Sequence, residues 1–316
     1  MTKEKKPHSA EYFGEQRDFW WNGDFLALMA GRWKLSQARS VLDAGCGIGH
    51  WGRVLAPFLS PDAALVGVDR EGEWVEKAAE IAEAKGLSRF TYRQGDANAL
   101  PFGDAQFDVV TCQTLLIHVP DPRATLREFA RVLKPGGLMA LCEPNNLAGS
   151  LVRDSENFDA DIGALTDAVR FQALCERGKA ALGRGNNSVG DLLPSLLHEA
   201  GLEDLQVYLS DKATLTLPHG SAASQTAGLA QTEDWLERDF WIWEKAETES
   251  YFRAGGGAPA EFPGLWADAM GRRRRSFQAA KEQRLCAVDA GLHYLISGRK
   301  PAARPSSAGA REPRKQ

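Results

Sequence analysis

Short apolar runs and longer amphipathic stretches alternate along the first half of the chain. The apolar runs begin at Val41, Ala64, Phe90, Phe107 and Leu138. Each run has the length of a buried strand, and stretches with helical spacing, such as residues 74–85 and 124–133, separate them. Strands that alternate with helices favour a doubly wound α/β fold, in which helices cover both faces of a mostly parallel sheet.

The second half predicts two more strands with a long insertion between them. Residues 202–211 begin a sixth strand and residues 290–299 contain the last one, so we expect a seven-stranded sheet. Residues 212–289 form a predicted helical insert, which we expect to act as a substrate lid. The insert comprises a Ser-, Thr- and Gly-rich entry, a Trp-rich helix, a glycine turn and a final helix, at residues 220–232, 233–253, 255–257 and 263–285.

The two ends of the chain differ from the predicted α/β core, which spans residues 40–211. Residues 10–39 predict a helical N-terminal cap, because aromatic and apolar side chains recur there near helical spacing. We expect residues 1–9 to be a flexible N-terminus. Residues 300–316 form a basic tail rich in Pro, Ala, Gly and Ser, which has too little apolar surface to fold and is predicted to be disordered.

Composition narrows the class of protein. The chain is 43% hydrophobic and 25% charged, which is typical of a globular protein, and no apolar run is long enough for a membrane span. The Lys-rich start lacks the apolar segment of a signal peptide. Its five cysteines are scattered without a C-x-x-C pair, which argues against disulfides and against a metal site. We therefore expect a cytoplasmic protein without a bound metal.

Charge gives little reason to expect nucleic acid as a partner. The formal net charge is −4, although four consecutive arginines occupy positions 272–275. The arginine run has two interpretations, a solvated helix face or a site for a phosphate or acidic partner. The sequence leaves both open, as it does the oligomeric state.

The most informative motif is D-x-G-x-G-x-G, which starts at Asp43 and directly follows the first apolar run. Glycine permits positive φ and a close approach of the backbone to a ligand. The turn lies at the carboxyl end of a strand, where open α/β sheets bind ligands. A NAD-type fingerprint requires a third glycine where this chain has His50. Asp43 would also repel a pyrophosphate, whereas it suits a cationic ligand such as an amino-acid ammonium.

Three further marks follow at the ends of later strands. Asp69 ends the second run, Asp96 and Ala97 follow the third, and a Lys-Pro-Gly-Gly turn at residues 134–137 precedes the fifth. Together with the glycine motif, they make residues 10–211 and 290–299 resemble class I S-adenosylmethionine (SAM) dependent methyltransferases, which have a Rossmann-like fold. The resemblance is greatest to the small-molecule enzymes of the ubiquinone and menaquinone biosynthesis type.

The resemblance implies SAM as the cofactor and assigns residues to its parts. Those expected around the methionine moiety are Asp43, Gly45, Cys46, Gly47 and Gly49. Asp69 would hold the ribose, Asp96 and Ala97 the adenine, and Gln113 would line the floor of the site. Arg70 could cover the adenine face, and Arg17 could bind the SAM carboxylate. Either arginine could instead be an ordinary surface residue.

Methyl transfer from a sulfonium needs in-line geometry and exclusion of water more than a dedicated acid or base. A base helps when the acceptor is a hydroxyl or a protonated amine. His118 and Glu143 are the candidates, because they follow or end the fourth and fifth strands. A packed, hydrogen-bonded histidine and ordinary turn chemistry are the simpler explanations.

Tryptophans gather in the two segments outside the core. They are Trp20 and Trp21 in the cap, and Trp235, Trp241 and Trp243 in the insert. They could form the walls of a pocket for an apolar or aromatic acceptor, or they could attach the accessory helices to the core.

The leading hypothesis is a SAM-dependent methyltransferase that acts on a small molecule. The chain has Gln113-Thr114-Leu115-Leu116 where amino-DNA methyltransferases carry an Asn/Asp-Pro-Pro-aromatic motif, which argues against a nucleic-acid substrate. A protein substrate remains an alternative, as does a non-catalytic SAM-binding or partner-regulating module. A NAD-dependent oxidoreductase is disfavoured by Asp43 and His50.

Overall fold

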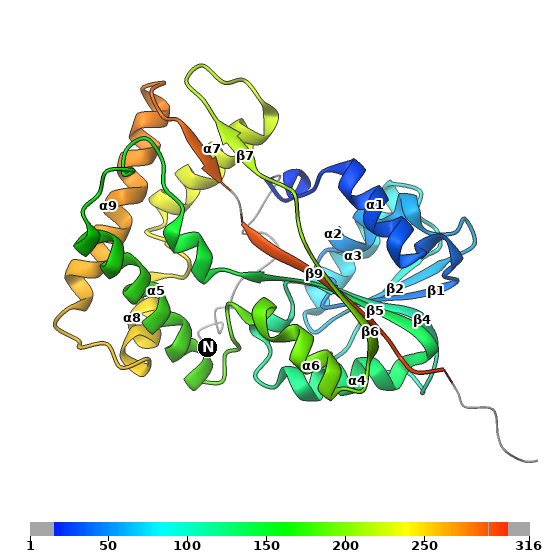
Figure 1. Ribbon diagram of the computed structural model, residues 1–316. Coiled ribbons are helices and arrows are strands. Elements are labelled where there is room, and N and C mark those ends of the chain that lie inside the picture. The colour runs from blue at the N-terminus through cyan, green and yellow to red at the C-terminus, as the bar shows by residue number, and fades with distance from the viewer. Residues whose placement is uncertain (1–15, 290, 303–316) are drawn as a thin grey trace, which may run out of the picture.

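The computed structural model describes residues 16–289 and 291–302, so the expectations for residues 1–9 and for most of the tail fall outside the described residues. Figure 1 shows a sheet flanked by helices and, beside it, a separate group of helices. The strands are β1 (Ser40–Ala44), β2 (Ala64–Asp69), β3 (Phe90–Gln94), β4 (Phe107–Gln113), β5 (Leu133–Asn145), β6 (Glu203–Leu209), β7 (Thr214–Thr216), β8 (Ala287–Asp289) and β9 (Leu292–Arg299).

The helices fall into those that cover the sheet and those that do not. The helices that cover the sheet are α1 (Gly23–Trp33), α2 (His50–Leu55), α3 (Gly72–Ala84), α4 (Pro122–Val132) and α6 (Leu193–Glu199). The others are α5 (Ile162–Ala181), α7 (Ala223–Glu237), α8 (Lys245–Ala254) and α9 (Phe262–Lys281), which we call the helical body.

The main sheet has the strand order β3-β2-β1-β4-β5-β9-β6. Strands β3, β2, β1, β4 and β5 are parallel, and β9 runs antiparallel between β5 and β6. The predicted doubly wound, mostly parallel seven-stranded sheet is therefore confirmed. The strand order reverses between β1 and β4, which is where open α/β sheets bind ligands at their carboxyl ends.

Alternate residues of the strands enter two apolar layers, as the two-residue repeat of a strand requires. Val41 and Val109 face one layer, in which α1, α2 and α3 pack on the sheet. Their neighbours Leu42 and Val110 face the other layer, against α4 and α6. Because both faces of the central strands are buried, apolar residues stand next to one another in these strands. The strands therefore appear in the sequence as continuous apolar runs.

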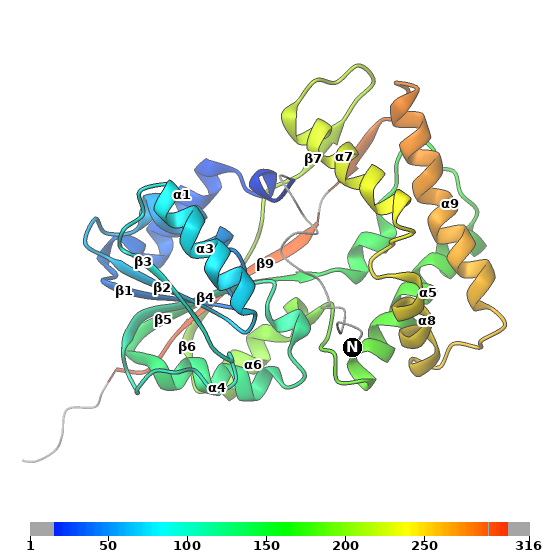
Figure 2. The ribbon, with the colours of Figure 1, turned by 180° about the vertical axis from the view of Figure 1, so that it is seen from behind.

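The helical body has an aromatic core of its own, apart from the sheet in both views (Figures 1 and 2). Phe171 of α5 stacks on Trp241 with ring centroids 4.8 Å apart, and Phe252 of α8 lies 5.8 Å from Phe262 of α9. The predicted α/β core of residues 40–211 includes α5, but the apolar side chains of this helix pack against the insert helices.

The prediction of one continuous Trp-rich helix over residues 233–253 is wrong, because the chain forms two separate helices there. Helix α7 ends at Glu237, Asp239 adopts a φ of 51°, and α8 begins only at Lys245. Trp243 lies in the intervening turn, where its side chain is fully buried in the aromatic core. Burial of this ring, rather than helix propensity, determines the path of the chain here.

Two further features of the insert differ from the expectation. Its Ser-, Thr- and Gly-rich entry, for which the sequence analysis assigned no secondary structure, is helical from Ala223 and forms most of α7. Strands β7 and β8 form a small antiparallel sheet, which the sequence analysis missed because each strand has three residues. Within the described residues, no helix has the length and apolar character needed to cross a membrane.

The two ends of the insert lie side by side. The Ser210 N–H donates to the His293 carbonyl at 2.9 Å, which joins the exit of β6 to the start of β9. Residues 16–22, which we call the N-terminal segment, are tied to the same place. The Asn22 side chain donates to Asp211 at 3.1 Å and accepts from Lys212 at 3.1 Å. The N-terminal segment and the insert therefore approach each other at the edge of the sheet.

Candidate functional site

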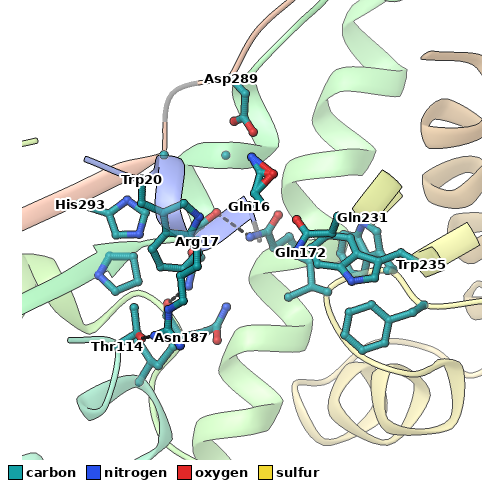
Figure 3. A pocket seen from close by; sticks show the side chains of 18 of the residues that line it. Gln16, Arg17, Trp20, Thr114, Gln172, Asn187, Gln231, Trp235, Asp289 and His293 are labelled. Atoms are coloured by element: carbon teal, nitrogen blue, oxygen red, sulfur yellow. Dashed lines mark hydrogen bonds between the residues drawn. The ribbon is translucent and has the colours of Figure 1, made fainter. Parts of the chain in front are cut away.

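A cavity of about 950 Å³ lies between the carboxyl ends of the parallel strands and the helical body. The sheet side of the cavity is formed by the glycine turn and the residues after β2, β3 and β4. The opposite side is formed by α5, α7, α9 and β8. Figure 3 shows side chains of both sides around this space, with Trp20, Arg17 and Thr114 on one side and Gln231 and Trp235 on the other.

The glycine turn has the strained backbone that its sequence predicts. Gly45, Gly47 and Gly49 adopt φ values of 66°, 51° and 74°. A Cβ on Gly45 would lie 2.5 Å from Leu115, and one on Gly49 would lie 2.6 Å from the Tyr92 hydroxyl. These positions require glycine both for φ and for space. Of the turn, Gly45, Cys46 and Gly47 line the cavity, whereas Gly49 does not.

Asp69 connects the glycine turn to the end of β2. Its Oδ2 accepts the Gly47 N–H at 2.8 Å and its Oδ1 accepts the Glu71 N–H at 3.0 Å. The side chain lines the cavity, and burial raises the pKa of its carboxyl while the two N–H donors oppose the shift. The strand-end carboxylate is thus held in one orientation beside the turn.

The predicted adenine residues lie further along the same edge of the cavity. Asp96 and Ala97 follow β3, and the Asp96 carboxylate accepts the backbone N–H of Asn98 at 2.8 Å. Arg70 also lines the cavity, with its Nε 3.5 Å from Glu71, but its side chain is 75% exposed. The structure therefore brings Asp69, Arg70, Asp96 and Ala97 to one edge of the cavity.

Asp43 lies behind the turn rather than in the cavity. Its side chain is fully buried, and Oδ2 accepts the Gly52 N–H of α2 at 3.0 Å. Its Oδ1 has no hydrogen-bond partner within the described residues. Burial raises the pKa of Asp43 to about 7, although Gly52 and Arg17 oppose the shift. The expected contact of this carboxylate with a ligand ammonium is corrected, because Asp43 does not line the cavity.

Arg17 and Gln113 face the cavity above Asp43. The Arg17 guanidinium donates to the Thr114 hydroxyl at 3.2 Å and lies 5.2 Å from the Trp20 ring centroid. Burial lowers the pKa of Arg17 to about 10, and Asp43 acts in the opposite sense. Gln113 ends β4 with 4% of its surface exposed, and its two amide atoms make no hydrogen bond within the described residues. Buried amide atoms normally have partners, so these two are suited to a polar ligand.

Thr114 has a backbone conformation that the sequence did not reveal. Its φ is 52°, although β-branched residues rarely adopt this region. Its N–H donates to the Cys142 carbonyl at 2.9 Å, which fixes it at the end of β4. Strain of this kind often occurs at ligand sites. The strain here bends the chain immediately after Gln113 and directs the following turn along the cavity.

The two candidate bases have different positions. His118 belongs to the single helical turn η4 (Leu116–His118) and lines the cavity. Glu143 is fully buried and does not line it. Instead, its Oε1 accepts the N–H groups of Leu115 and Leu116 at 2.8 and 2.9 Å. Burial raises the pKa of Glu143 to about 7. The proposed catalytic role of Glu143 is therefore corrected to that of holding the turn that carries His118.

Lys179 of α5 holds the same turn from the opposite direction. Its ammonium donates to the Ile117 carbonyl at 2.5 Å and to the Asn187 side chain at 3.3 Å. The side chain is 2% exposed, and burial lowers the pKa of Lys179 to about 8. An ionisable group with so little water around it depends on these acceptors. The sequence analysis missed Lys179, because a lysine near the end of an amphipathic helix is normally solvated.

Lys179 belongs to a polar stripe on α5 that also contains Gln172 and Glu176. The Gln172 amide donates to the Asn146 carbonyl at 2.7 Å, and the Ser188 hydroxyl donates to Glu176 at 2.6 Å. Their spacing of four and three residues places them on one helix face. This face connects the helical body to the ends of β4 and β5, whereas Phe171 and Cys175 of α5 pack against the insert.

Some of these tryptophans line the cavity, and others attach the accessory segments to the rest of the protein. Trp20, Trp235 and Trp241 line the cavity. Trp21 instead packs on Trp51 of α2 at 5.2 Å, and Trp243 lies in the core of the helical body. Both walls of the cavity therefore carry indole rings, while the other two rings attach the accessory segments.

Comparison with known proteins identifies the family. Residues 35–201, more than half of the chain, match a family model described as a methyltransferase domain. The chain belongs to the methyltransferase family. The predicted resemblance to class I SAM-dependent methyltransferases is thereby confirmed. The matched residues contain the glycine turn, Asp69, Asp96, Gln113 and His118, but not the insert that forms the far wall of the cavity.

Relatives of this methyltransferase match mainly the same region. The uncharacterized methyltransferase YcgJ of Bacillus subtilis is 36% identical over 135 residues, which are 43% of this chain and 52% of the relative. A demethylmenaquinone methyltransferase of Geobacillus kaustophilus is 31% identical over 128 residues, which are 40% of this chain and 53% of the relative. The chain thus spans about half the length of these curated relatives.

Solved structures resemble the methyltransferase chain in fold. A candidate methyltransferase from Bacillus halodurans superposes with a TM-score of 0.51 at 22% identity, and the match covers 88% of this chain and all of that one. The [4+2]-cyclase SpnF has a TM-score of 0.50 at 20% identity, covering 89% of this chain and 81% of its own. At this level of identity the likeness extends to the fold alone.

Proposed function

We propose that the protein is a SAM-dependent methyltransferase whose acceptor is a small molecule bound between the glycine turn and the helical body. The proposal rests above all on the hydrogen bond between Asp69 and Gly47, at the cavity edge of a chain that belongs to the methyltransferase family. It fixes a carboxylate beside a positive-φ glycine backbone, which is the arrangement expected for a nucleoside ligand.

The residues of the sheet side fit the parts of SAM. Arg17 and the unpaired amide of Gln113 offer polar contacts for its amino-acid end. Asp69 offers a carboxylate for the ribose hydroxyls, and Asp96 and Ala97 offer an edge for the adenine. We propose that Asp43 supports this site indirectly, by fixing the start of α2 through Gly52.

Bound SAM would supply an electrophilic methyl group on a sulfonium. The chain contributes position and the exclusion of water, which can account for a large part of the rate in such transfers. Leu115 and Gly45 are closely packed, so the turn after β4 is fixed relative to the donor site. Within that turn, we propose that His118 accepts the proton of an acceptor that carries a hydroxyl or a protonated amine.

The size and composition of the cavity support a small-molecule acceptor. Small-molecule sites are commonly about 300–1,000 Å³, and a cavity near the upper end has room for a donor and an acceptor together. The indole rings of Trp20 and Trp235 line the space with apolar surface. The family includes demethylmenaquinone methyltransferases, which are consistent with an acceptor that contains an apolar ring.

Calorimetric titration of the purified protein with S-adenosylhomocysteine tests the donor site, with NADH as the comparison. We expect binding of S-adenosylhomocysteine and none of NADH. Incubation with SAM and a panel of ring-bearing acceptors then tests turnover through formation of S-adenosylhomocysteine. Binding without any turnover across the panel would favour the non-catalytic module. Absence of binding would overturn the proposed function.

A further inference from the structure

The end of the cavity remote from the glycine turn carries charged side chains that methyl transfer does not explain. Arg272 and Arg273 of α9 line it, opposite Asp289 of β8. Both arginines belong to the run of four that the sequence analysis left without a role. Figure 3 shows the Asp289 side chain above Gln16, among the residues around this space.

Arg273 is held rigidly in position. Its Nη1 donates to the carbonyls of Phe240 and Trp241 at 3.0 and 2.8 Å. The guanidinium carbon lies 5.1 Å from the ring centroid of Trp235, so the planar group is also packed on an aromatic face. A fixed guanidinium loses little conformational entropy when it binds a ligand.

The hydrogen-bonding capacity of Arg273 is only partly used. A guanidinium has five N–H donors, and the two carbonyls occupy those on Nη1. Nε and Nη2 make no hydrogen bond to the described residues, and neither is a buried unsatisfied atom. These remaining donors form the edge that binds a carboxylate through two parallel hydrogen bonds.

The charged side chains near Arg273 balance formally, because Arg272 and Arg273 are opposed by Asp154 and Asp289. Asp154 uses its oxygens on other partners, since it accepts from the Ser276 hydroxyl at 2.5 Å, the Asn157 amide at 2.8 Å and a backbone N–H. Asp289 makes no ion pair with Arg273 within the described residues, although its charge raises the pKa of Arg273 against the larger effect of burial. Arg272 adds a second cation.

We propose that Arg273 is an anion-binding residue of the acceptor site and that the acceptor is an organic acid, with an apolar ring body and a carboxylate at its non-reacting end. The ring body would lie along the indole-lined space, and the carboxylate would bind Nε and Nη2 of Arg273. This inference deepens the proposed function and depends on it, because it names the chemical class of the acceptor.

Arg274 provides a matched control within the same helix. It is the next residue of α9, but its guanidinium is largely exposed and lies 3.2 Å from Asp239 on the outer surface. Arg274→Gln therefore removes the same charge from the same helix without changing the cavity. Asp289→Asn is a second informative variant, because it removes the carboxylate that would repel a bound acid.

The experiment compares 1-naphthoate with its neutral isostere 1-naphthamide as probes of the protein saturated with S-adenosylhomocysteine. We expect calorimetry to show at least about 10-fold tighter binding of the carboxylate, which corresponds to about 1.4 kcal/mol. Arg273→Gln should abolish this preference and Arg274→Gln should retain it. Asp289→Asn should increase it by about 2–5-fold, since one nearby negative charge is removed.

Equal affinity for the two probes, or no binding of the carboxylate, would overturn the inference. If Arg273→Gln fails to fold, the Asp289→Asn variant decides the matter, because an unchanged preference in it would count against a carboxylate at this end. The affinity for S-adenosylhomocysteine, measured in the same samples, separates this inference from the proposed function. Absence of the carboxylate preference in the wild-type protein, with intact binding of S-adenosylhomocysteine, contradicts the organic-acid acceptor alone.

Discussion

The two walls of the cavity differ in how their residues are distributed along the chain. On the sheet side, backbone groups at adjacent strand ends form the site, and Asp69 contacts a glycine only 22 residues away. On the side of the helical body, long side chains form the wall, and Lys179 reaches a carbonyl 62 residues away. The comparison indicates that the donor side depends on backbone conformation, whereas the acceptor side depends on packing between distant segments.

The largest expected effect tests the backbone dependence of the donor side. Gly47→Val places a β-branched residue at a φ of 51°, in the turn that lines the cavity. We expect the dissociation constant for S-adenosylhomocysteine to rise at least about 100-fold, or about 2.8 kcal/mol, as measured by calorimetry. Gly86→Val is the control. Its φ is 68°, but the space around it is open and it lies outside the cavity. Similar losses in both variants would show that backbone strain alone, and not the site, is responsible.

A smaller effect is expected when a side chain of the donor side is removed. Asp69→Ala leaves the N–H groups of Gly47 and Glu71 without their acceptor and removes the proposed ribose ligand. Affinity for S-adenosylhomocysteine should fall about 10–100-fold, because hydrogen bonds to charged groups are worth about 1.5–3 kcal/mol. Asp62→Ala, which removes an exposed carboxylate paired with Arg39, should change nothing. Undiminished affinity in Asp69→Ala would contradict the assignment of the ribose site.

Lys179 links the two walls, because it extends from α5 to the turn after β4. Its replacement tests whether this contact holds the turn in place. Lys179→Met removes the ammonium that holds the Ile117 carbonyl, so amide hydrogen exchange in residues 115–118 should accelerate about 10-fold. Affinity for S-adenosylhomocysteine should change by less than about 3-fold. Lys300→Met is the matched control, since this lysine donates to the Ala130 and Leu133 carbonyls at 2.7 and 2.8 Å, outside the cavity. Lys300→Met should accelerate exchange near residue 130 and not at residues 115–118, and unchanged exchange at residues 115–118 in Lys179→Met would refute the holding role of Lys179.

The raised pKa of Glu143, which holds the turn after β4, predicts that the stability of the protein depends on pH. Its pKa of about 7 exceeds its ordinary value of 4.5, so between these values the folded protein binds more protons than the unfolded chain. This contribution to stability is therefore lost as pH rises from 4.5 to 7. Relative to Glu143→Gln, the wild type should lose about 1–2 kcal/mol over this range, measured by urea unfolding at several pH values.

Glu128 offers a control with the opposite sign. Arg131 lowers the pKa of its carboxyl, so its contribution is present above the ordinary pKa and is lost as pH falls. The stability difference between the wild type and Glu128→Gln should accordingly grow with rising pH. A difference for Glu143→Gln that also grew with pH would contradict the buried, proton-retaining state of Glu143.

The sequence predicted which residues gather on the sheet side of the cavity, because its signals there are local. The apolar runs, the glycines and the strand-end carboxylates each follow from neighbouring residues, and Asp69, Asp96 and Gln113 all reach the cavity. Asp43 and Glu143 were misplaced, since the sequence does not show on which side of a strand end a carboxylate is buried. In both cases backbone N–H groups hold the carboxylate behind the cavity, from the following helix α2 for Asp43 and from the earlier turn after β4 for Glu143.

The acceptor side was predicted only as a helical insert. Helix α5 has apolar residues, Phe171 among them, that pack on the insert and polar residues that pack on the strand ends, so no simple amphipathic pattern assigned it to either unit. Arg273 acquires its environment from carbonyls more than 30 residues away, in a turn that the sequence suggested was helical. Tertiary packing determines both the unit to which α5 belongs and the environment of Arg273, and a local sequence pattern does not encode such packing.

The hydrogen bond between Ser210 and His293 has a consequence for how such proteins diversify. Because the start and finish of the insert adjoin, a segment of almost any length can be exchanged there at little entropic cost, about 0.6 kcal/mol for each doubling of its length. Helix α5 limits this freedom. A transplanted segment must bring a surface that covers Phe171, Leu174 and Cys175 of α5, or these apolar side chains will be left in water.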